Sequence, residues 1–385
     1  LSAAEALAGM GLEVLLVEKE ERCGGLMLGL NVLETGKSAA GQVSELAATV
    51  AATAGVTVFT ASRVAEISGY IGNFKVAIET PTGRVEDTVG CIVVACGAVP
   101  LVEEGLFGYN GKDVITQMEL EQRLATGSFK AARVVMIQCA GARNATREYC
   151  SRICCATAVK NAMIIKRKYP LAEVHVLYRD MQMYGDEKEQ MLWDARGMGI
   201  KFHVFDQKKP PRVGDGKVTF QHAVLDETKE FKVDLTVLST PLVARPESSQ
   251  VAALMRVPCD KNGFFLEAHA KLRPLDFAAD GIFVCGSARY PVTSVEARTQ
   301  GLGVASRIGA ILFKEKLVKS GIVAEIDQET CVGCMGCLNV CPYEAIIFNR
   351  ETGVCEVKEI LCKGCGNCAS TCPSHSAVLR GYKPE

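Results

Sequence analysis

The chain has 385 residues, an apolar fraction of 48% and a formal net charge of −1. This length accommodates two or three domains with substantial cores, and the balanced charge gives no sign of a nucleic-acid partner or of electrostatic membrane binding. Many of its 18 cysteines stand in metal-ligand spacings within a long chain, so we expect a reducing cytoplasm rather than a disulfide scaffold. No apolar run approaches the length of a membrane span and no signal peptide is visible, so we expect membrane contact only through a partner.

The first residues have the pattern of a nucleotide-binding unit, with a helix at 3–10 and then a strand. Glu18 follows this strand, where dinucleotide-binding folds place an acid that accepts hydrogen bonds from the adenosine ribose. An ordinary charge at the end of a strand is the alternative. Lys19 and the later pair Gly24 and Gly25 complete a pattern common beside the pyrophosphate of FAD enzymes, which favours FAD. Because the sequence starts within a helix and without methionine, we expect it to be truncated, with the first strand and glycine loop missing.

The next elements are typical of a flavin domain. The pattern predicts a helix at 38–54, a strand at 56–60 and an antiparallel pair at 74–80 and 83–88 around a Thr-Pro-Thr-Gly turn.

A buried strand then runs from Cys91 into Ala95, Cys96 and Gly97. It resembles the Val-Val-Ala-Thr-Gly segment that returns the chain to the FAD in flavoproteins with two dinucleotide-binding domains. Cys96 stands where those proteins have threonine, and we interpret Cys91 and Cys96 as small buried residues.

A capping box at Thr116 and Glu119 opens a short helix, and the following strand at 133–138 leads to the most informative internal segment. In a pyridine-nucleotide flavoprotein, a second glycine-rich loop would follow and hold the NAD(P) pyrophosphate. Here a single glycine remains, and four cysteines replace the loop: Cys139, Cys150, Cys154 and Cys155.

Four thiols in a short segment suggest a 4Fe-4S cluster, with three of them at the start of a helix that runs to Lys168. Helical spacing would put Cys150 and Cys154 on one face, with Cys155 reaching the same cluster from the adjacent position. A zinc site and buried structural cysteines are the alternatives. Spacing alone does not decide among them, because an adjacent Cys-Cys pair is not a common iron–sulfur pattern.

The rest of this segment keeps the pattern of a second dinucleotide fold. Its expected elements are a strand at 173–180, a helix at 186–198 and strands at 200–205, 218–224 and 231–239. We assign no chemistry to the strand histidines His175, His203 and His222.

The chain then returns to the flavin half with a strand that ends at Gly286 and Ser287 and a helix expected at 293–319. This resembles the closing strand of FAD-dependent reductases, in which an aspartate binds the ribityl chain. Ser287 replaces that aspartate and weakens the assignment, although a hydroxyl still offers one hydrogen bond. Gln300 and Gly301 stand where those reductases approach the isoalloxazine ring.

Two cysteine rows follow a linker expected at 320–330. Each row has the bacterial ferredoxin spacing, in which three cysteines ligate one 4Fe-4S cube and the fourth ligates the cube of the other row. The expected ligand sets are Cys331, Cys334, Cys337 and Cys372 for one cluster, and Cys362, Cys365, Cys368 and Cys341 for the other. Zinc knuckles fit the CxxC pairs but not the third cysteine or the crossed fourth.

These features predict an α/β protein with a two-dinucleotide-binding-domain, thioredoxin-reductase-like core and an α+β bacterial-type ferredoxin domain. We expect an FAD-binding domain at 1–115 and 270–319, a second dinucleotide-type domain at 116–269 and the ferredoxin domain at 320–385.

With these residues in place, the chain resembles the A-type subunit of heterodisulfide reductase and related iron–sulfur flavoproteins. The resemblance is carried by Ser68–Val76, by the four central cysteines followed by Ala158–Ala162, and by the two terminal cysteine rows. It implies that the central cysteines bind a 4Fe-4S cluster, so that the cofactors are FAD and three clusters. The additional amino-terminal domain and the inserted second ferredoxin module of longer members are not found, so the resemblance leaves open whether electrons bifurcate.

We therefore predict an electron-transfer subunit of a multi-subunit oxidoreductase, with other redox subunits as partners and an oligomeric assembly in the cytoplasm. No CxxC redox pair near the flavin and no base or nucleophile constellation is evident, which argues against small-molecule chemistry on this chain. One alternative is an NAD(P)H:acceptor oxidoreductase of the glutamate-synthase small-subunit type, and another is a flavin-free interaction module that carries clusters.

Overall fold

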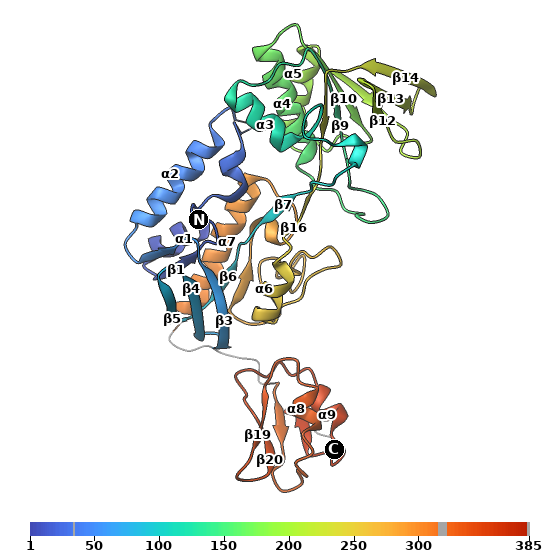
Figure 1. The fold of residues 1–385 in the computed structure, drawn as a ribbon. Helices are drawn as coiled ribbons and strands as arrows, with labels where there is room; N and C mark the ends of the chain where they lie inside the picture. The colour runs from blue at the N-terminus through green and yellow to red at the C-terminus, as the bar shows by residue number, and fades with distance from the viewer. Residues whose placement is uncertain (34, 315–321, 383–385) are drawn as a thin grey trace. The chain divides into compact units, whose positions relative to one another are not determined.

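The computed structural model describes residues 1–33, 35–314 and 322–382, which form two compact units, Leu1–Gly309 and Ala310–Glu385 (Figure 1). Across these ranges, no helix is long and apolar enough to cross a membrane.

The first part of unit 1 is built from segments at both ends of the unit. In chain order it contains α1 (Ser2–Gly9), β1 (Val14–Val17), η1 (Gly25–Gly29), α2 (Ala39–Ala52), β2 (Val56–Phe59), β3 (Arg63–Tyr70), β4 (Asn73–Thr80), β5 (Gly83–Val89), β6 (Ile92–Val94) and β7 (Ala98–Pro100), and later β16 (Leu242–Ala244), α6 (Ser248–Met255), β17 (Ile282–Val284), η3 (Gly286–Ala288) and α7 (Ser294–Leu312). Strand β1 pairs with β2 in parallel, and β6 pairs in parallel with β17. The chain therefore returns, after the second part, to pair with a strand of its first hundred residues.

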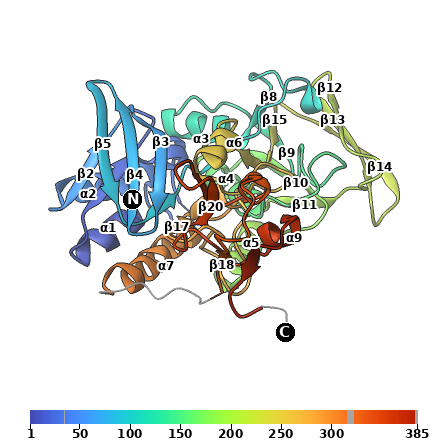
Figure 2. The same cartoon turned by 90° about the horizontal axis from the view of Figure 1, so that it is seen from below.

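An antiparallel sheet of β3, β4 and β5 lies beside these parallel pairs (Figure 2). The two predicted strands of the excursion are confirmed, whereas β3 was not predicted. Apolar side chains of β4 such as Phe74 pack with Val94 of β6 and with Ile282 and Val284 of β17. This packing joins the sheet to the β6–β17 pair.

The second part of unit 1 is a parallel sheet with covered faces. Its elements are η2 (Leu106–Gly108), β8 (Val114–Thr116), α3 (Gln117–Thr126), β9 (Arg133–Ile137), α4 (Cys154–Lys168), β10 (Glu173–Tyr178), α5 (Asp186–Gly197), β11 (Lys201–Val204), β12 (Arg212–Gly214), β13 (Lys217–His222), β14 (Glu227–Lys232) and β15 (Leu235–Leu238). The strand order is β11-β10-β9-β15-β8, all parallel. The chain order reverses between β9 and β15, and open α/β sheets bind ligands beyond the carboxyl ends of the strands at such a point.

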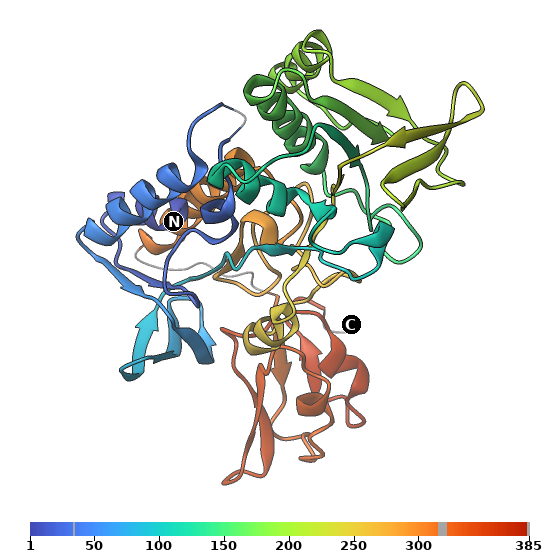
Figure 3. The same cartoon turned by 45° about the horizontal axis from the view of Figure 1, so that its top comes forward.

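Each face of this sheet has its own core. Helices α3, α4 and α5 cover one face, and the hairpin sheet β12–β14 lies against the other (Figures 1 and 3). Successive side chains of a strand point to opposite faces, so Val134 and Met136 of β9 face the helices while Val135 and Ile137 face the hairpin sheet. The predicted capping box of α3 is present, with Thr116 and Glu119 bonded reciprocally.

Four sequence-based expectations about elements are wrong. Residues 231–239 are not one strand, because the chain leaves the β12–β14 sheet after Lys232 and re-enters the parallel sheet as β15. Cys150 is not helical, since Arg152 has a left-handed φ of 63° and α4 begins only at Cys154. Helix α7 ends at Leu312, and residues 315–319 of the expected helix lie outside the described ranges.

The fourth wrong expectation is the linker at 320–330, because this segment contains a strand of the second unit. That unit consists of β18 (Ala324–Ile326), α8 (Gly336–Asn339), β19 (Ile346–Asn349), β20 (Val354–Val357), α9 (Asn367–Thr371) and β21 (Ala377–Leu379). Strand β18 pairs with β21 and β19 with β20, both antiparallel. The unit therefore consists of two similar halves, and each half contributes one strand to each of the two pairs. The second row of cysteines begins 31 residues after the first.

A buried ion pair joins the two parts of unit 1. Glu121 of α3 is fully buried and pairs with Lys160 of α4, which is 9% exposed at its side chain. Lys160 Nζ also donates to the carbonyl of Val32 at 2.7 Å, and the Asn31 N–H donates to Glu121 at 3.0 Å. The two charges neutralise each other, and the segment that leads into α2 forms a hydrogen bond with each of them. These bonds tie the segment to the second part of unit 1.

Replacing Lys160 with methionine should lower the free energy of unfolding by about 3 kcal/mol, because it leaves the Glu121 carboxylate buried without its cation. Urea denaturation followed by circular dichroism measures this loss. The matched control is Lys261→Met, whose partner Glu148 is exposed, and it should change the free energy by no more than about 0.5 kcal/mol. Equal losses in the two variants would contradict a structural role for the buried pair.

Candidate functional site

The four central cysteines come together at the carboxyl ends of the parallel strands. Cys139 is the second residue after β9, and Cys154 and Cys155 open α4. All four line one pocket, together with Gln138, Ala142, Arg143, Ser151, Arg152, Asp180 and Gln182. Asp180 follows β10, and the Cys154 thiol donates to the carbonyl of Thr240, which follows β15, at 3.5 Å. The pocket therefore lies at the reversal point of the strand order, where this class of fold binds its ligands.

The backbone of this pocket is turned by residues in the left-handed region. Cys139, Arg143 and Arg152 have φ values of 59°, 54° and 63°. Gly141 also has positive φ, and an added Cβ there would lie 2.5 Å from Leu101 Cδ2. These turns bring Cys150 beside the other three thiols without the helical arrangement that the spacing suggested, and the Arg152 N–H donates to Cys150 Sγ at 3.3 Å.

Positive charge surrounds the four thiols. The Arg143 guanidinium pairs with Asp180 at 2.6 Å, and Arg179 donates to the Arg143 carbonyl at 2.9 Å. Arg152 pairs with Glu296 at 2.7 Å and lies over the ring of Tyr290. These cations suit a site that holds thiolates and the negative charge of an iron–sulfur cluster.

Several buried polar atoms at this pocket have no partner within the described ranges. They are both side-chain polar atoms of Gln138, Nη1 of Arg143 and, nearby, Nε of Arg179. Buried polar groups are normally hydrogen-bonded, and Gln138 Oε1 is an acceptor while the other three atoms are donors. The three donors indicate a bound group that accepts hydrogen bonds. The donor set therefore fits a sulfur-rich, negatively charged cofactor.

Burial favours the protonated form of three of these thiols, Cys139, Cys154 and Cys155. Burial raises the pKa of Cys154 to about 12 and that of Cys155 to about 11. Burial also raises the pKa of Cys139, against the opposing effect of Arg143 and Arg179. Ligation requires thiolates, so binding of metal here releases protons.

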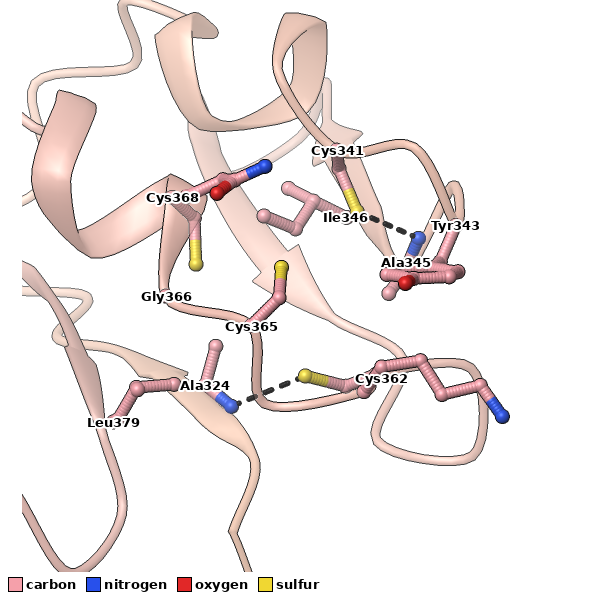
Figure 4. A pocket seen from close by; sticks show the side chains of 12 residues that line it. Ala324, Cys341, Tyr343, Ala345, Ile346, Cys362, Cys365, Gly366, Cys368 and Leu379 are labelled. Atoms are coloured by element: carbon pink, nitrogen blue, oxygen red, sulfur yellow. Dashed lines mark hydrogen bonds between the residues drawn. The ribbon is translucent and has the colours of Figure 1, made fainter. Parts of the chain in front are cut away.

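The second unit brings the crossed ligand set of one terminal cluster together. Cys341, Cys362, Cys365 and Cys368 line one pocket, and their sulfur atoms point toward a common space (Figure 4). Backbone donors reach these sulfurs, from Ala324 to Cys362 at 3.2 Å and from Ala345 to Cys341 at 3.3 Å. Such N–H···S contacts are the surroundings that iron–sulfur ligands require.

The other expected set is also gathered in this unit. Cys331, Cys337 and Cys372 belong to the core of the second unit, which also contains cysteines of the other set, and an added Cβ at Gly336 would lie 3.7 Å from Cys334 Sγ and 3.8 Å from Thr371. Burial raises the pKa of Cys372, but hydrogen bonds from Ser376, the Ala377 N–H and Ser374 outweigh it and lower the pKa to about 6. Cys372 thus favours the thiolate form that a ligand needs.

In none of these places, over the described ranges, do three His, Cys, Asp or Glu side chains converge as ligands of a single ion. The cysteines instead surround the pockets.

Two glycines allow the cysteine rows to pack against the opposite half of the unit. Gly333 has a φ of 64°, and an added Cβ would lie 2.3 Å from the carbonyl oxygen of Gly353. Gly364 has a φ of 63°, and an added Cβ would lie 2.6 Å from the carbonyl oxygen of Ile322. Both positions therefore require glycine, because any side chain would overlap a backbone oxygen of the opposite half.

The predicted flavin contacts form two groups. Ala95 and Gly97 follow β6, and Gly286 and Ser287 follow its parallel partner β17, so all four lie at one edge. Gln300 Oε1 accepts the Gly286 N–H at 2.8 Å, and Ser287 Oγ accepts the Val292 N–H at 3.4 Å.

Glu18, Lys19, Gly24 and Gly25 form the other group, after β1. Glu18 accepts the Glu20 N–H at 3.1 Å, and Lys19 pairs with Glu247 at 2.8 Å. Arg245, close to Glu247 in the chain, donates to the Cys96 carbonyl at 2.6 Å, so one segment contacts both groups.

Gly301 has different surroundings, because an added Cβ there would lie 3.1 Å from the backbone nitrogen of Ala3. Its position serves the close packing of α7 on α1.

Comparison with known proteins decides the family. An iron–sulfur subunit of the CoB–CoM heterodisulfide reductase from Methanopyrus kandleri is 30% identical, and the match covers 92% of this chain and 69% of that protein. The chain belongs to the family of A-type iron–sulfur subunits of heterodisulfide reductase. The corresponding iron–sulfur subunit of Methanocaldococcus jannaschii is 34% identical over 69% of this chain and 44% of its own length, so the match spans less than half of that relative. Residues 323–346 match the family described as a 4Fe-4S binding domain.

Solved structures confirm the predicted fold of this family member. Thioredoxin reductase of T. acidophilum has a TM-score of 0.55 at 17% identity, over 81% of this chain and 95% of that one. The Lactococcus lactis thioredoxin reductase has a TM-score of 0.54 at 18% identity, over 80% and 93%. The chain is thus a thioredoxin-reductase-like core joined to a ferredoxin-type unit.

Sequence reasoning missed several residues of these sites in this member of the heterodisulfide reductase family. Gln138, Arg143, Arg152 and Asp180 line the central pocket, yet no spacing rule marks them. Cys355 was also missed, and it lies in the core beside the first terminal row. Its place was visible in the repeat, because Cys355 stands 31 residues after Ala324.

Gly364→Ala tests the close approach in the second unit. The substitution should cost about 1 kcal/mol for the left-handed backbone and about 2 kcal/mol more for the overlap with Ile322, with loss of iron from the chain. Gly381→Ala is the matched control, because its φ is 84° but nothing lies within 4 Å of an added Cβ. Thermal unfolding and iron analysis of both variants measure the difference, and equal behaviour would contradict the role of the contact.

Proposed function

We propose that this chain is an electron-transfer component of a heterodisulfide-reductase-like complex, and that it passes electrons between FAD, three 4Fe-4S clusters and partner redox subunits. The observation that carries the proposal is the central pocket. Four thiols and three arginines surround the place where a fold of this class would hold the phosphates of a nicotinamide dinucleotide. The printed names of the relatives, iron–sulfur subunits of heterodisulfide reductases, support the same assignment.

The proposed ligands of the central cluster are Cys139, Cys150, Cys154 and Cys155. Arg143 and Arg152 offset the negative charge of the site, and Gln138 and Arg143 offer donors that have no partner within the described ranges. Hydrogen bonds and charge near the sulfurs set the potential of a cluster, so these residues favour the reduced state.

For FAD, the proposed contacts are the two groups after β1 and at the ends of β6 and β17. When bound, FAD exchanges two electrons with one partner and single electrons with another. Glu18 would accept hydrogen bonds from the ribose, and Gly24 and Gly25 would let the backbone approach the pyrophosphate. Ser287 offers one hydroxyl to the ribityl chain in place of a carboxylate. These residues orient the flavin and take no chemical part.

The terminal unit would then be the port to a partner protein. Cys334 and Cys365 are exposed, whereas Cys337, Cys362 and Cys368 are buried. Each proposed cluster therefore has a solvent-facing ligand and a protected side, which suits exchange of electrons with another protein. The proposed complex lies in the cytoplasm.

Removal of the central ligands should lower the iron content selectively. The full chain should hold about twelve iron atoms when purified anaerobically, and the double variant Cys154→Ala/Cys155→Ala about eight. Cys91→Ala is the matched control, since Cys91 is partly buried and lies outside all three ligand sets, and it should retain about twelve. Colorimetric iron analysis measures the difference. An unmodified chain with about eight would remove the central cluster from the proposal.

Nicotinamide nucleotides alone should not reduce the flavin, because cysteines occupy the loop that would bind their pyrophosphate. In an anaerobic titration, we expect flavin absorption bands that persist on addition of NAD(P)H and bleach on addition of dithionite. Rapid bleaching by NAD(P)H would instead support the glutamate-synthase-like alternative. A brown protein without flavin bands would support the flavin-free cluster-carrying module.

A further inference from the structure

Cys355 of β20 is a buried cysteine beside the first terminal row. It is 1% exposed and lies in the core of the second unit, which contains cysteines of both rows; its sulfur lies near Cys331, Cys334 and Cys337. No ferredoxin spacing assigns it a ligand role, because the eight cysteines of the two rows already complete both sets. The side chain is therefore a thiol next to a proposed cluster rather than one of its ligands.

The contacts of Cys355 aim its sulfur at the ligand loop. The Cys337 thiol, as long as it keeps its proton, donates to the Cys355 sulfur, and the N–H of Met335, between Cys334 and Cys337, donates to the same sulfur. Gln328 Nε2 donates to the Cys355 carbonyl at 3.1 Å and holds the strand in place. Cys331 and Cys334 also lie close enough to act on Cys355 electrostatically. The thiol is thus fixed among three of the four proposed ligands.

The repeat within the unit gives a second, independent observation. The residue equivalent to Cys355 in the first half is Ala324, 31 positions earlier, and Ala324 lines the pocket of Cys341, Cys362, Cys365 and Cys368. Figure 4 shows Ala324 beside this pocket, with its N–H directed at Cys362. The same place in the fold therefore presents a methyl group to one cysteine set and a thiol to the other.

A thiol at this place changes the electrostatics of one site only. As a thiolate ligand Cys337 has no proton to donate, so the direction of the bond reverses and the S–H of Cys355 becomes the donor. A donor stabilises negative charge on the ligand sulfur, and this charge is greater when the cluster holds the additional electron. Ala324 offers no such donor.

We propose that Cys355 is a positioning residue that raises the reduction potential of the cluster held by Cys331, Cys334, Cys337 and Cys372 above that of its neighbour. The two otherwise similar sites then differ in electron affinity, so an electron in the terminal unit resides preferentially on this cluster. Reduction adds one electron and transfers no atom, and Cys355 keeps its proton throughout. The inference rests on the proposed function only in requiring that both terminal clusters are bound.

The test is a redox titration of the full chain, purified anaerobically, followed by electron paramagnetic resonance. Cys355→Ala, which copies the Ala324 side chain, should lower a single midpoint potential and leave the others unchanged. A net hydrogen-bond contribution predicts a roughly two- to tenfold change in the ratio of reduced to oxidised cluster at fixed potential, where tenfold corresponds to about 59 mV. Cys355→Ser, which retains a donor, should restore most of the difference.

The reciprocal variant Ala324→Cys should raise a different midpoint, and Cys91→Ala should change none. Iron content is measured on every variant. Unchanged midpoints in a Cys355→Ala chain with full iron content would overturn the inference. If the Cys355→Ala chain loses iron, the Ala324→Cys variant is the deciding test. The absence of a raised midpoint potential in that variant would overturn the inference. An unmodified chain without iron in the terminal unit would instead overturn the proposed function.

Discussion

Cysteines that are near one another in sequence surround a shared space only where the backbone turns more sharply than a helix or strand allows. In this chain, residues with left-handed backbone conformation make these sharp turns, both at the central cysteine pocket and in the terminal cysteine rows. Cys139 and Arg152 turn the central segment. Gly333 and Gly364 turn the terminal rows against carbonyl oxygens of the opposite half. The non-glycine positions cost about 1–2 kcal/mol each, and the buried sheet beneath the central segment supplies the stability that holds them.

The central pocket depends on the parallel sheet as much as on its cysteines. Cys139, Asp180 and Thr240 follow three different strands, and they meet because parallel strands end at the same edge. The thioredoxin-reductase-like fold thus provides a ligand site whose position is set by topology, and the loop after β9 decides its chemistry. Cysteines and arginines in that loop suit a metal cluster, whereas glycines would suit a nucleotide.

The terminal unit illustrates how a repeated fold supports unequal sites. Its two halves share strand pairing, glycine contacts and cysteine spacing, so the ligand geometry of the two sets is similar. Ala324 and Cys355 break this equivalence at one buried position. A difference of one side chain near a sulfur alters the electrostatics of a site without altering its ligands. Direction of electron flow within such a unit depends on differences of this kind.

The sequence by itself determined the family, the fold class, many of the strands and the cysteine rows, because fixed cysteine spacings and hydrophobic periods are local properties. The sequence-based assignment of secondary structure failed where the path of the backbone depends on tertiary contacts. It treated 231–239 as one strand, although the chain changes sheets at Lys232, and it placed Cys150 on a helix that begins only at Cys154. Gln138, Arg143 and Arg152 lie within or beside the central cysteine segment, but only the tertiary structure directed them at the thiols and placed Asp180, from the end of another strand, among them. The direction of these side chains depends on left-handed turns and on strand pairing, which no local spacing rule encodes.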